Sequence, residues 1–441
     1  MQTVFDKLPL YAGVLILLAS MLGVSSLLFS DKESPFINLQ IPERVAPGQP
    51  MRAVVGDKRP GLRSLFVSVS RPGAHPEVLI LDLKGNDYEK TVQFCLQDDE
   101  NAESQAVIRI EAVDKSLNNL FRGNTSIRVQ PVYLDNLSPS AEFEIPASPL
   151  VRGGSAFIRF NASEDLGAAF LAAGPLAFPL YSIGPRRYQS LVTMPVDVEP
   201  SSFNLYLALA DLVGNSARLS VPLQKEDKQF NEDSILLTSK FLQGKVKEFS
   251  GLVPGEKDVL TLFLRINNEE RIKNYKEIQR LCQDTSTEPL WEGPFIHLPR
   301  STRRSNFADQ RRYMLNDVTV DRQIHLGLDY SSTPKAEIPA ANHGRVIFAG
   351  YLGIHGNMVL IDHGHSLHSL YSHLSSFRVG VGETVRKGQI IGITGTSGIA
   401  VGEHLHFEIL VNGISVNPDE WADPEWISKT ALKGADPAAS F

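Results

Sequence analysis

The stretch GEHLHFEILVNG, residues 402–413, joins an apolar strand pattern to two histidines. His404 and His406 lie two positions apart, so on a β-strand they project from one face, while Leu405 and Phe407 take the other. Two neutral imidazoles side by side on a core-like strand are costly unless they bind something. A zinc ion with a catalytic water would satisfy them, and a solvent-facing pair on an edge strand is the alternative.

A second element, QIHLGLDYSS at residues 323–332, carries His325 and Asp329. Their even separation places both on one side of a strand. A straight strand would hold them about 13 Å apart at about 3.3 Å per residue, whereas the ligands of one zinc each lie about 2.0–2.2 Å from the metal. The chain must therefore bend between them, and Gly327 is the residue that permits the bend.

A third element, LYSHLSSF at residues 370–377, contains His373 and lies between a predicted strand and a glycine-punctuated stretch. Of the 11 histidines in the chain, ten lie within residues 297–406. Histidine is a common zinc ligand and a general acid or base near neutral pH. The concentration of histidines therefore indicates a site, and the spacing of the motifs decides which kind.

Taken together, the stretch from about residue 291 to residue 418 resembles the M23 family of zinc metallopeptidases, the lysostaphin and LytM-like cell-wall endopeptidases. The segments HLGLD, GNMVLIDHG, LYSHLS, VRKGQIIGITGTSG and HLHFEI occur in the family's order and at its usual distances. One departure lies upstream of the first motif, where Phe307-Ala308 replaces the usual Phe-Gly; it is expected to alter the groove entrance and not the metal site. The resemblance implies a β-rich domain with zinc at the floor of a groove, acting on cross-link or stem peptides of bacterial peptidoglycan.

The resemblance also implies a role for each motif residue. His325, Asp329 and His406 match the ligands of one zinc ion per chain. His373 and His404 match the pair that positions the water and stabilises the oxyanion. Two imidazoles and one carboxylate leave a fourth coordination position for water, as catalytic zinc requires.

Four other histidines of this region are predicted to have structural positions and no part in the metal site. His363 matches the Asp-His-Gly turn of the family and is interpreted as scaffold. His355, His365 and His368 are assigned to loops or to the rim of the groove.

The chain upstream of this region predicts β-sandwiches. Short alternating strands such as SLFVSVS (64–70) are punctuated by Gly, Pro, Asn and Asp, and no long helical pattern interrupts them. A weak repeat links IEAVDKSLNN (110–119) to LALADLVGN (207–215) and resembles immunoglobulin-like modules. We place two such modules at residues 35–137 and 138–225.

Residues 226–290 are charged and helical in period, which predicts a helical connector with Asn267 or Asn268 as an N-cap. The peptidase-like domain is assigned to residues 291–425 and a tail to residues 426–441. We expect the connector or the sandwich before it to restrict access to the groove through a regulatory contact, and a plain spacer is the alternative.

Residues 1–34 are predicted to form an N-terminal membrane anchor. The stretch from Leu8 to Ser30 contains no charge, and a transmembrane helix needs about 20 apolar residues. A cleaved signal peptide is the alternative, but this stretch exceeds the usual h-region of about 7–15 residues and lacks an A-x-A-like cleavage site. Either interpretation places the remaining chain on the extracytoplasmic, periplasmic or cell-wall side of a bacterial membrane.

The predicted fold class is therefore mostly β: a transmembrane helix, two β-sandwich modules, a helical connector and a C-terminal LytM-like peptidase domain. The net charge of −7 gives no reason to expect nucleic acid, because duplex-binding proteins usually show a basic face. The expected partners are peptidoglycan peptides and, through the N-terminal helix, the membrane. Cys95 and Cys282 do not form a zinc-finger pattern, and their pairing is left open.

Two other functions remain open from the sequence. Some LytM-like domains are catalytically inactive binding modules that activate or scaffold other cell-wall enzymes, but these typically lack a zinc ligand, whereas all five motif residues are present here. A hydrolase directed at another extracellular peptide is the third possibility.

Overall fold

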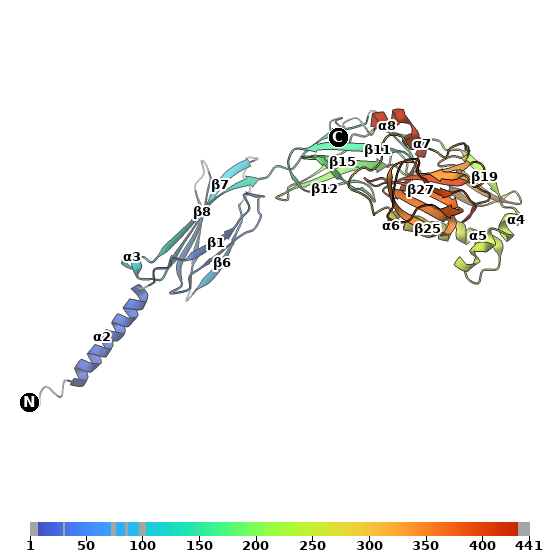
Figure 1. Ribbon diagram of the computed structural model, residues 1–441. Coiled ribbons are helices and arrows are strands. Elements are labelled where there is room, and N and C mark those ends of the chain that lie inside the picture. The colour runs from blue at the N-terminus through green and yellow to red at the C-terminus, as the bar shows by residue number, and fades with distance from the viewer. Residues whose placement is uncertain are drawn as a thin grey trace, which may run out of the picture. The chain divides into compact units, whose positions relative to one another are not determined.

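The computed structural model describes residues 8–29, 31–71, 76–83, 87–96, 103–146 and 148–430 (Figure 1). It confirms a mostly β protein with several sheets, a helical segment and a C-terminal β-rich domain. The chain divides into two compact units, one of residues 1–138 with 210–216 and one of residues 139–209 with 217–441. Each unit is described below by itself.

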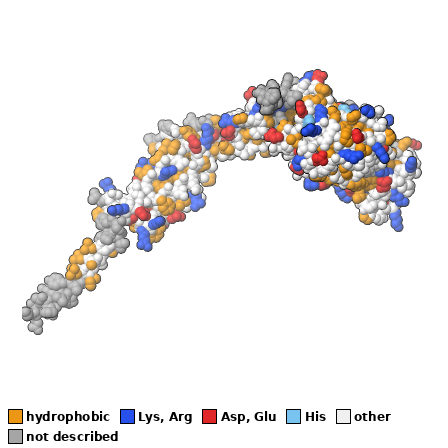
Figure 2. Space-filling view, in the orientation of Figure 1, with side chains coloured by type: hydrophobic (Ala, Val, Ile, Leu, Met, Phe, Trp, Pro, Cys, Tyr) orange, Lys and Arg blue, Asp and Glu red, His pale blue; other side chains and the backbone are white. Residues whose placement is uncertain are grey.

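The apolar segment near the N-terminus forms helix α2 (Leu8–Phe29), and hydrophobic side chains cover its described part (Figure 2). Within the described residues, no helix is both long enough and apolar enough to cross a membrane. Residues 1–7 and residue 30 of the predicted anchor, and the side chains at both ends of α2, lie outside the described part. The predicted transmembrane anchor therefore has no support from the described residues.

The first unit consists mainly of two sheets that share one core. The three-stranded sheet has the order β1-β3-β6, and the five-stranded sheet has the order β2-β8-β7-β4-β5. Strand β4 shows the predicted alternation, because Leu65, Val67 and Val69 are buried and pack with Val55 of β3. The elements are β1 (Phe36–Gln40), β2 (Arg44–Val45), β3 (Met51–Gly56), β4 (Leu62–Ser70), β5 (Glu77–Asp82), β6 (Glu89–Phe94), β7 (Glu103–Asp114), α3 (Asn118–Phe121) and β8 (Thr125–Asp135).

The second unit begins with two four-stranded sheets, in the orders β14-β15-β11-β9 and β13-β12-β16-β17, and with the parallel pair β10-β18. Phe160 of β11 and Leu207 of β16 lie in the core that the two sheets share. The strands are β9 (Ala141–Glu144), β10 (Leu150–Val151), β11 (Ser155–Ala162), β12 (Leu166–Ala173), β13 (Leu176–Phe178), β14 (Tyr181–Gly184), β15 (Arg187–Thr193), β16 (Leu205–Asp211), β17 (Ser216–Ser220) and β18 (Lys225–Glu226).

The helical segment follows strand β19 (Glu232–Leu236) and comprises α4 (Ser239–Gln243), η1 (Val246–Leu252), α5 (Val259–Arg265), the π-helical turn η2 (Ile266–Glu270) and α6 (Arg271–Leu281). The predicted N-cap at Asn267 or Asn268 is wrong. The helical run starts earlier, at Asp258, whose carboxylate accepts from the backbone N–H of Thr261. Asn267 is fully buried inside the run, and its amide donates to Asp321.

The C-terminal part contains three sheets. The main sheet has the order β20-β23-β31-β27-β26-β25-β29, with β32 paired to β31, and two three-stranded sheets have the orders β24-β30-β28 and β19-β21-β22. The elements are β20 (Thr302–Ser305), β21 (Gln310–Leu315), β22 (Val318–Ile324), β23 (Leu328–Ser331), β24 (Glu337–Pro339), β25 (Gly344–Leu352), η3 (Gly353–His355), β26 (Gly356–Asp362), β27 (Leu367–Leu374), β28 (Ser376–Phe377), β29 (Thr384–Val385), β30 (Ile390–Ile393), β31 (Leu405–Val411), β32 (Ile414–Val416), α7 (Pro418–Ala422) and α8 (Pro424–Thr430).

The central strand β31 is buried on both faces, and its alternation decides where the functional side chains lie. Leu405, Phe407 and Ile409 belong to a large core that also includes side chains of α7 and α8. The opposite face carries Leu410, which packs with Ile278 of α6. Since strand residues alternate between faces, positions 406 and 408 face the side that α6 covers.

The sheets preceding β19 also pack on the C-terminal part. Phe157 of β11 belongs to the same core as Trp421 of α7, and the indole N–H of Trp421 donates to Ser155 Oγ at 3.1 Å. Within the second unit, the predicted second sandwich, helical connector and peptidase region therefore pack against one another. Cys95 and Cys282 are both free thiols.

Candidate metal centre

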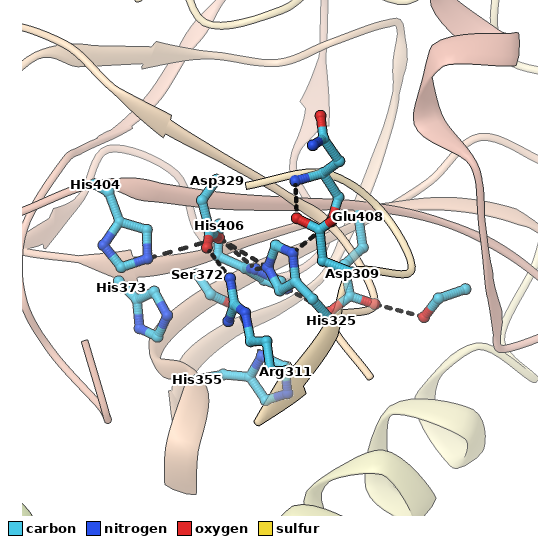
Figure 3. A network of polar contacts seen from close by, with 12 residues as sticks. Asp309, Arg311, His325, Asp329, His355, Ser372, His373, His404, His406 and Glu408 are labelled. Carbon is cyan, nitrogen blue, oxygen red and sulfur yellow. Dashed lines mark hydrogen bonds and ion pairs between the residues drawn. The ribbon is translucent and has the colours of Figure 1, made fainter. Parts of the chain in front are cut away.

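Three strands and a bend bring the predicted metal ligands together. His325 follows β22, Asp329 lies on β23, and His406 lies on β31, where it pairs directly with Asp329 in the antiparallel register. His325 Nε2 is 3.0 Å from Asp329 Oδ1 and 3.0 Å from His406 Nδ1, and His406 Nδ1 is 2.9 Å from Asp329 Oδ1. Figure 3 shows the three side chains directed at one point.

The bend between His325 and Asp329 is present, as the spacing required, because β22 ends before His325 and β23 begins after Gly327. Gly327 is needed for close approach. A Cβ atom at this position would lie 2.5 Å from the carbonyl oxygen of Phe407 and 2.7 Å from His406 Cε1. The absence of a side chain therefore lets the first ligand segment lie directly against β31.

The residues fit a catalytic zinc. The three ligand atoms lie within 4.8 Å of one another and the residues are buried, and ligands about 2.0–2.2 Å from a tetrahedral metal are separated by about 3.3–3.6 Å. Burial disfavours a charged His406, but its hydrogen bonds to Asp329 and Glu408 outweigh this and raise its pKa to about 9. Burial likewise disfavours the charged form of the Asp329 carboxylate, yet the interactions with His325 and His406 hold the pKa of this carboxyl well below its usual value. The cluster thus favours a positive charge at its centre.

Hydrogen bonds on the far side of each imidazole fix which nitrogen faces the centre. His325 Nδ1–H donates to the carbonyl oxygen of Asn306 at 2.8 Å, which leaves the lone pair on Nε2. His406 Nε2–H donates to Glu408 at 2.8 Å, so Nδ1 is the nitrogen that faces the cluster and would bind a metal once it loses its proton. Glu408 is 3% exposed and also accepts from Ser415 Oγ at 2.5 Å. Such outer partners typically orient metal-binding histidines.

His373 and His404 lie beside the cluster, as predicted, with ring centroids 4.8 Å apart. His373 Nδ1–H donates to the carbonyl oxygen of Ser397 at 2.9 Å, and His404 Nδ1–H donates to that of Gly402 at 2.7 Å. In both rings Nε2 is left as a proton acceptor, and His404 Nε2 is 3.7 Å from Asp329 Oδ1. Burial and the neighbouring histidines hold the pKa of His373 well below its usual value, which keeps this ring neutral.

The backbone of His373 is held in the left-handed region, with φ at 66°. A residue other than glycine rarely adopts this conformation, and such residues cluster at functional sites. The pairing of β27 with β26 shifts register between Tyr371 and Leu374, and such an irregularity re-aims a side chain, here the His373 ring towards the cluster.

Two residues at the centre were missed by the motif analysis. Arg311 of β21 forms an ion pair with Asp329, with 2.6 Å between Nη2 and Oδ2 (Figure 3). His355, assigned from sequence to a loop or the rim, lies on η3 with its ring centroid 6.1 Å from that of His406, and its Nδ1 is 3.0 Å from Ser372 Oγ. Neither residue belongs to a zinc motif, and both reach the site through packing between distant elements.

The assignment of His368 to a loop or the rim is wrong, since it is a fully buried residue of strand β27. His365 lies in a loop, as expected, but is only 5% exposed. His365 lies in a turn that the preceding sheets cover, and its ring stacks on Tyr181 at 4.2 Å. His363 is bonded on both nitrogens, to the carbonyl oxygen of His343 at 2.6 Å and to Ser369 Oγ at 2.7 Å. These contacts agree with its interpretation as scaffold.

The metal centre opens into a cavity of about 740 Å³. One wall is the sheet with the histidines. The opposite wall comes from the helical segment, with Phe263, Arg271 and Tyr275, and a third side comes from the β21–β22 hairpin, with Arg311 and Tyr313. The cavity is therefore formed jointly by the peptidase region and the helices that precede it.

The comparisons with known proteins agree with this geometry. The sequence profile described as Peptidase family M23 matches residues 323–418. The DD-carboxypeptidase/endopeptidase Mpg of Neisseria meningitidis is 37% identical over 112 residues, which are 25% of this chain and 26% of that protein. The peptidoglycan DD-endopeptidase ShyC of Vibrio cholerae is 40% identical over 126 residues, 28% of each chain. This chain thus spans about a quarter of the length of these relatives.

Among solved structures, the catalytic domain of lysostaphin from Staphylococcus simulans matches with 26% identity and a TM-score of 0.25. The match covers 30% of this chain and 98% of that domain.

Proposed function

We propose, from the premise that residues 323–418 form an M23 peptidase domain, that this protein is a zinc-dependent endopeptidase. Its proposed substrates are the peptide cross-links or stem peptides of bacterial peptidoglycan. The observation that carries the proposal is the convergence of His325, Asp329 and His406, with His373 and His404 beside them.

One zinc ion per chain would be held by His325 Nε2, Asp329 Oδ1 and His406 Nδ1. When bound, zinc supplies a Lewis acid and lowers the pKa of a coordinated water. The hydrogen bonds from His325 to Asn306 and from His406 to Glu408 keep the ligand nitrogens in the required tautomers. Asp329 contributes the negative charge that the cluster needs.

The two histidines beside the ligands are proposed to move protons. Both present an unprotonated Nε2 towards the cavity, so either can accept the proton of an attacking water. The protonated ring then becomes a donor, which can stabilise the oxyanion or return the proton to the leaving amine. The low pKa of His373 assigns it the neutral, accepting state before the reaction.

Peptidoglycan as the substrate is supported by the names of the similar proteins, two of which are a DD-carboxypeptidase/endopeptidase and a peptidoglycan DD-endopeptidase. Because peptidoglycan lies outside the cytoplasmic membrane, we place the enzyme on the extracytoplasmic side. Digestion of purified peptidoglycan, with mass spectrometry of the released muropeptides, tests the reaction and identifies the bond. Products that persist after zinc chelation, or no products from zinc-loaded protein, would contradict the proposal.

We also propose that the helical segment before the domain restricts access to the groove. The side chain of Asn274 on α6 accepts from the backbone N–H of Ile354 at 2.8 Å, next to His355. The contact is close, since a Cβ atom on Gly353 would lie 2.2 Å from Asn274 Oδ1. It supports a helix fixed over the catalytic face of the sheet.

Asn274→Ala removes this contact and is expected to speed hydrolysis of intact peptidoglycan more than hydrolysis of a short peptide. Rates are compared per bound zinc, so that partial unfolding does not mimic a loss. Equal acceleration of both substrates, or none, would leave the segment as a fixed wall.

A further inference from the structure

We propose that Arg271 and Arg311 form a carboxylate-binding subsite beside the metal centre. The enzyme would then prefer peptides that carry a free carboxylate near the scissile bond. The inference rests on the proposed peptidase function and names the chemical class of its substrate.

Arg271 is a partly buried cation without an anionic partner. It begins α6, lines the cavity, and donates from Nε to the carbonyl oxygen of Asn267 at 3.1 Å and from Nη2 to Asn267 Oδ1 at 2.6 Å. Among the described residues it forms no ion pair, and Nη1 has no hydrogen-bond partner. Burial, with a further contribution from Arg311, lowers its pKa, yet a guanidinium stays charged at neutral pH.

An unpaired cation in such a place is costly unless something compensates it. Asn267 supplies only neutral acceptors on the side of the helix. The guanidinium edge that faces the cavity remains available, and a planar guanidinium matches a carboxylate with two parallel hydrogen bonds.

Arg311 places a second guanidinium on the same cavity. Its Nη2 binds Asp329 Oδ2 at 2.6 Å, while its Nε is buried and has no hydrogen-bond partner. The negative charge of Asp329 is also the charge that a metal ion would use. With zinc bound, Arg311 would share the carboxylate of Asp329 with a divalent cation, which would leave positive charge next to Arg271.

Apart from Asp329, which pairs with Arg311, no described acidic side chain on the cavity forms an ion pair with either guanidinium. Glu408 is bound to His406 and Ser415, and Glu403 is bound to Thr394 and to the backbone of Lys335. Asp197 is exposed to solvent. Asp321 and Glu408 act on the charge of Arg271 only from beyond hydrogen-bond distance, and among the described residues no carboxylate binds its guanidinium directly. A ligand carboxylate can fill that place.

A peptide held over the metal centre can supply this carboxylate from two sources, its C-terminus or a side chain. Both present the same planar anion to the two guanidinium groups. Arg271 lies on the helical wall of the cavity and Arg311 on the β21–β22 hairpin beside Asp329. We assign the pair to specificity for the residue next to the cleaved bond and not to proton transfer.

The test uses the full chain loaded with zinc and a synthetic stem pentapeptide that contains diaminopimelate and ends in D-Ala-D-Ala. Three versions are compared: all carboxylates free, only the C-terminal carboxylate amidated, and only the side-chain carboxylate amidated. We expect one amidation to lower kcat/KM by about tenfold to hundredfold, the range for hydrogen bonds to a charged group. The amidation that does so identifies the source.

Arg271→Gln should lower kcat/KM by a similar factor for the peptide whose carboxylates are all free. It should not change kcat/KM for the amidated peptide that the wild type cleaves slowly, so that the variant no longer prefers the free carboxylate. Arg271→Lys keeps the charge and should restore part of the preference. Arg265→Gln is the matched control, because Arg265 lies on the same helical run, pairs with Glu269 at 3.1 Å and is exposed. Zinc content should be equal in all variants.

Equal rates for the three peptides in the wild type, or an unchanged preference in Arg271→Gln, would overturn the subsite while the peptidase function stands. If no peptide is cleaved while purified peptidoglycan is digested, the peptidase function stands; if neither is cleaved, it fails. The affinity of the same peptides, measured by calorimetry, then tests the subsite. Equal affinity for the free and the amidated peptides would refute it.

Discussion

Glu408 offers a sharp test of how the metal centre is organised. Its carboxylate, 3% exposed, accepts from His406 Nε2 at 2.8 Å and from Ser415 Oγ at 2.5 Å. Burial disfavours the charged carboxylate, but the hydrogen bond from His406 outweighs it and lowers its pKa. In the change Glu408→Gln the amide oxygen can still accept from His406, so the tautomer is kept while the charge is lost.

The expected magnitude follows from these contacts. A hydrogen bond to a charged group contributes about 1.5–3 kcal/mol and a neutral one about 0.5–1.5 kcal/mol. The difference, about 1–1.5 kcal/mol, corresponds to about a tenfold loss of zinc affinity. Outer partners of metal-binding histidines commonly show losses of about tenfold to hundredfold.

Zinc affinity is measured by competition with a chromophoric chelator at fixed pH. Glu337→Gln is the matched control, because Glu337 is an exposed residue of β24 in the same domain, and it should bind zinc as the wild type does. Glu408→Ala should in addition lower the melting temperature, since it leaves the buried His406 N–H and the Ser415 hydroxyl without their acceptor. Wild-type zinc affinity in Glu408→Gln would refute the reasoning.

Three further results are expected. Asp329→Ala should lose most of the bound zinc in metal analysis, because it removes a ligand and the partner of Arg311; unchanged zinc would sink the ligand assignment. His373→Ala and His404→Ala should keep zinc but lose about 10²–10⁴-fold in hydrolysis, and loss of metal in either would show that the roles are divided wrongly. Burial lowers the pKa of His363 to about 4, below about 6.5 in the unfolded chain, so protonation favours unfolding. As the pH falls from about 6.5 to about 4, protonation of His363 should therefore lower the free energy of unfolding by up to about 3 kcal/mol. In thermal melts, His363→Gln should show a weaker dependence of stability on pH.

The convergence of His325, Asp329 and His406 could be predicted because each motif encodes its own local geometry. Alternation on a strand places His404 and His406 on one face, and metal distances require the bend between His325 and Asp329. The structure agrees on both points and adds that Gly327 is needed for contact with β31. The membrane anchor, in contrast, has no support in the described residues.

The outer part of the site could not be predicted in the same way. Arg271, Arg311 and His355 reach the cavity from α6, β21 and η3, which are separated in sequence and carry no shared motif. The N-cap expected near Asn267 failed because the buried side chain binds Asp321 and the helix continues through it. At this position the tertiary contact with Asp321 outweighs the local preference of asparagine for a helix N-terminus.

By itself, the sequence determined the strand pattern, the spacing of the five motif residues and their family resemblance, since these depend on neighbours within a few positions. Only the tertiary structure decided that α6 covers the face of β31 that carries His406 and Glu408. A helical repeat shows that α6 has an apolar stripe, but not which sheet face receives it. That choice is made by the packing of Ile278 and Cys282 against Leu410 and its neighbours, a long-range fit that no local pattern encodes.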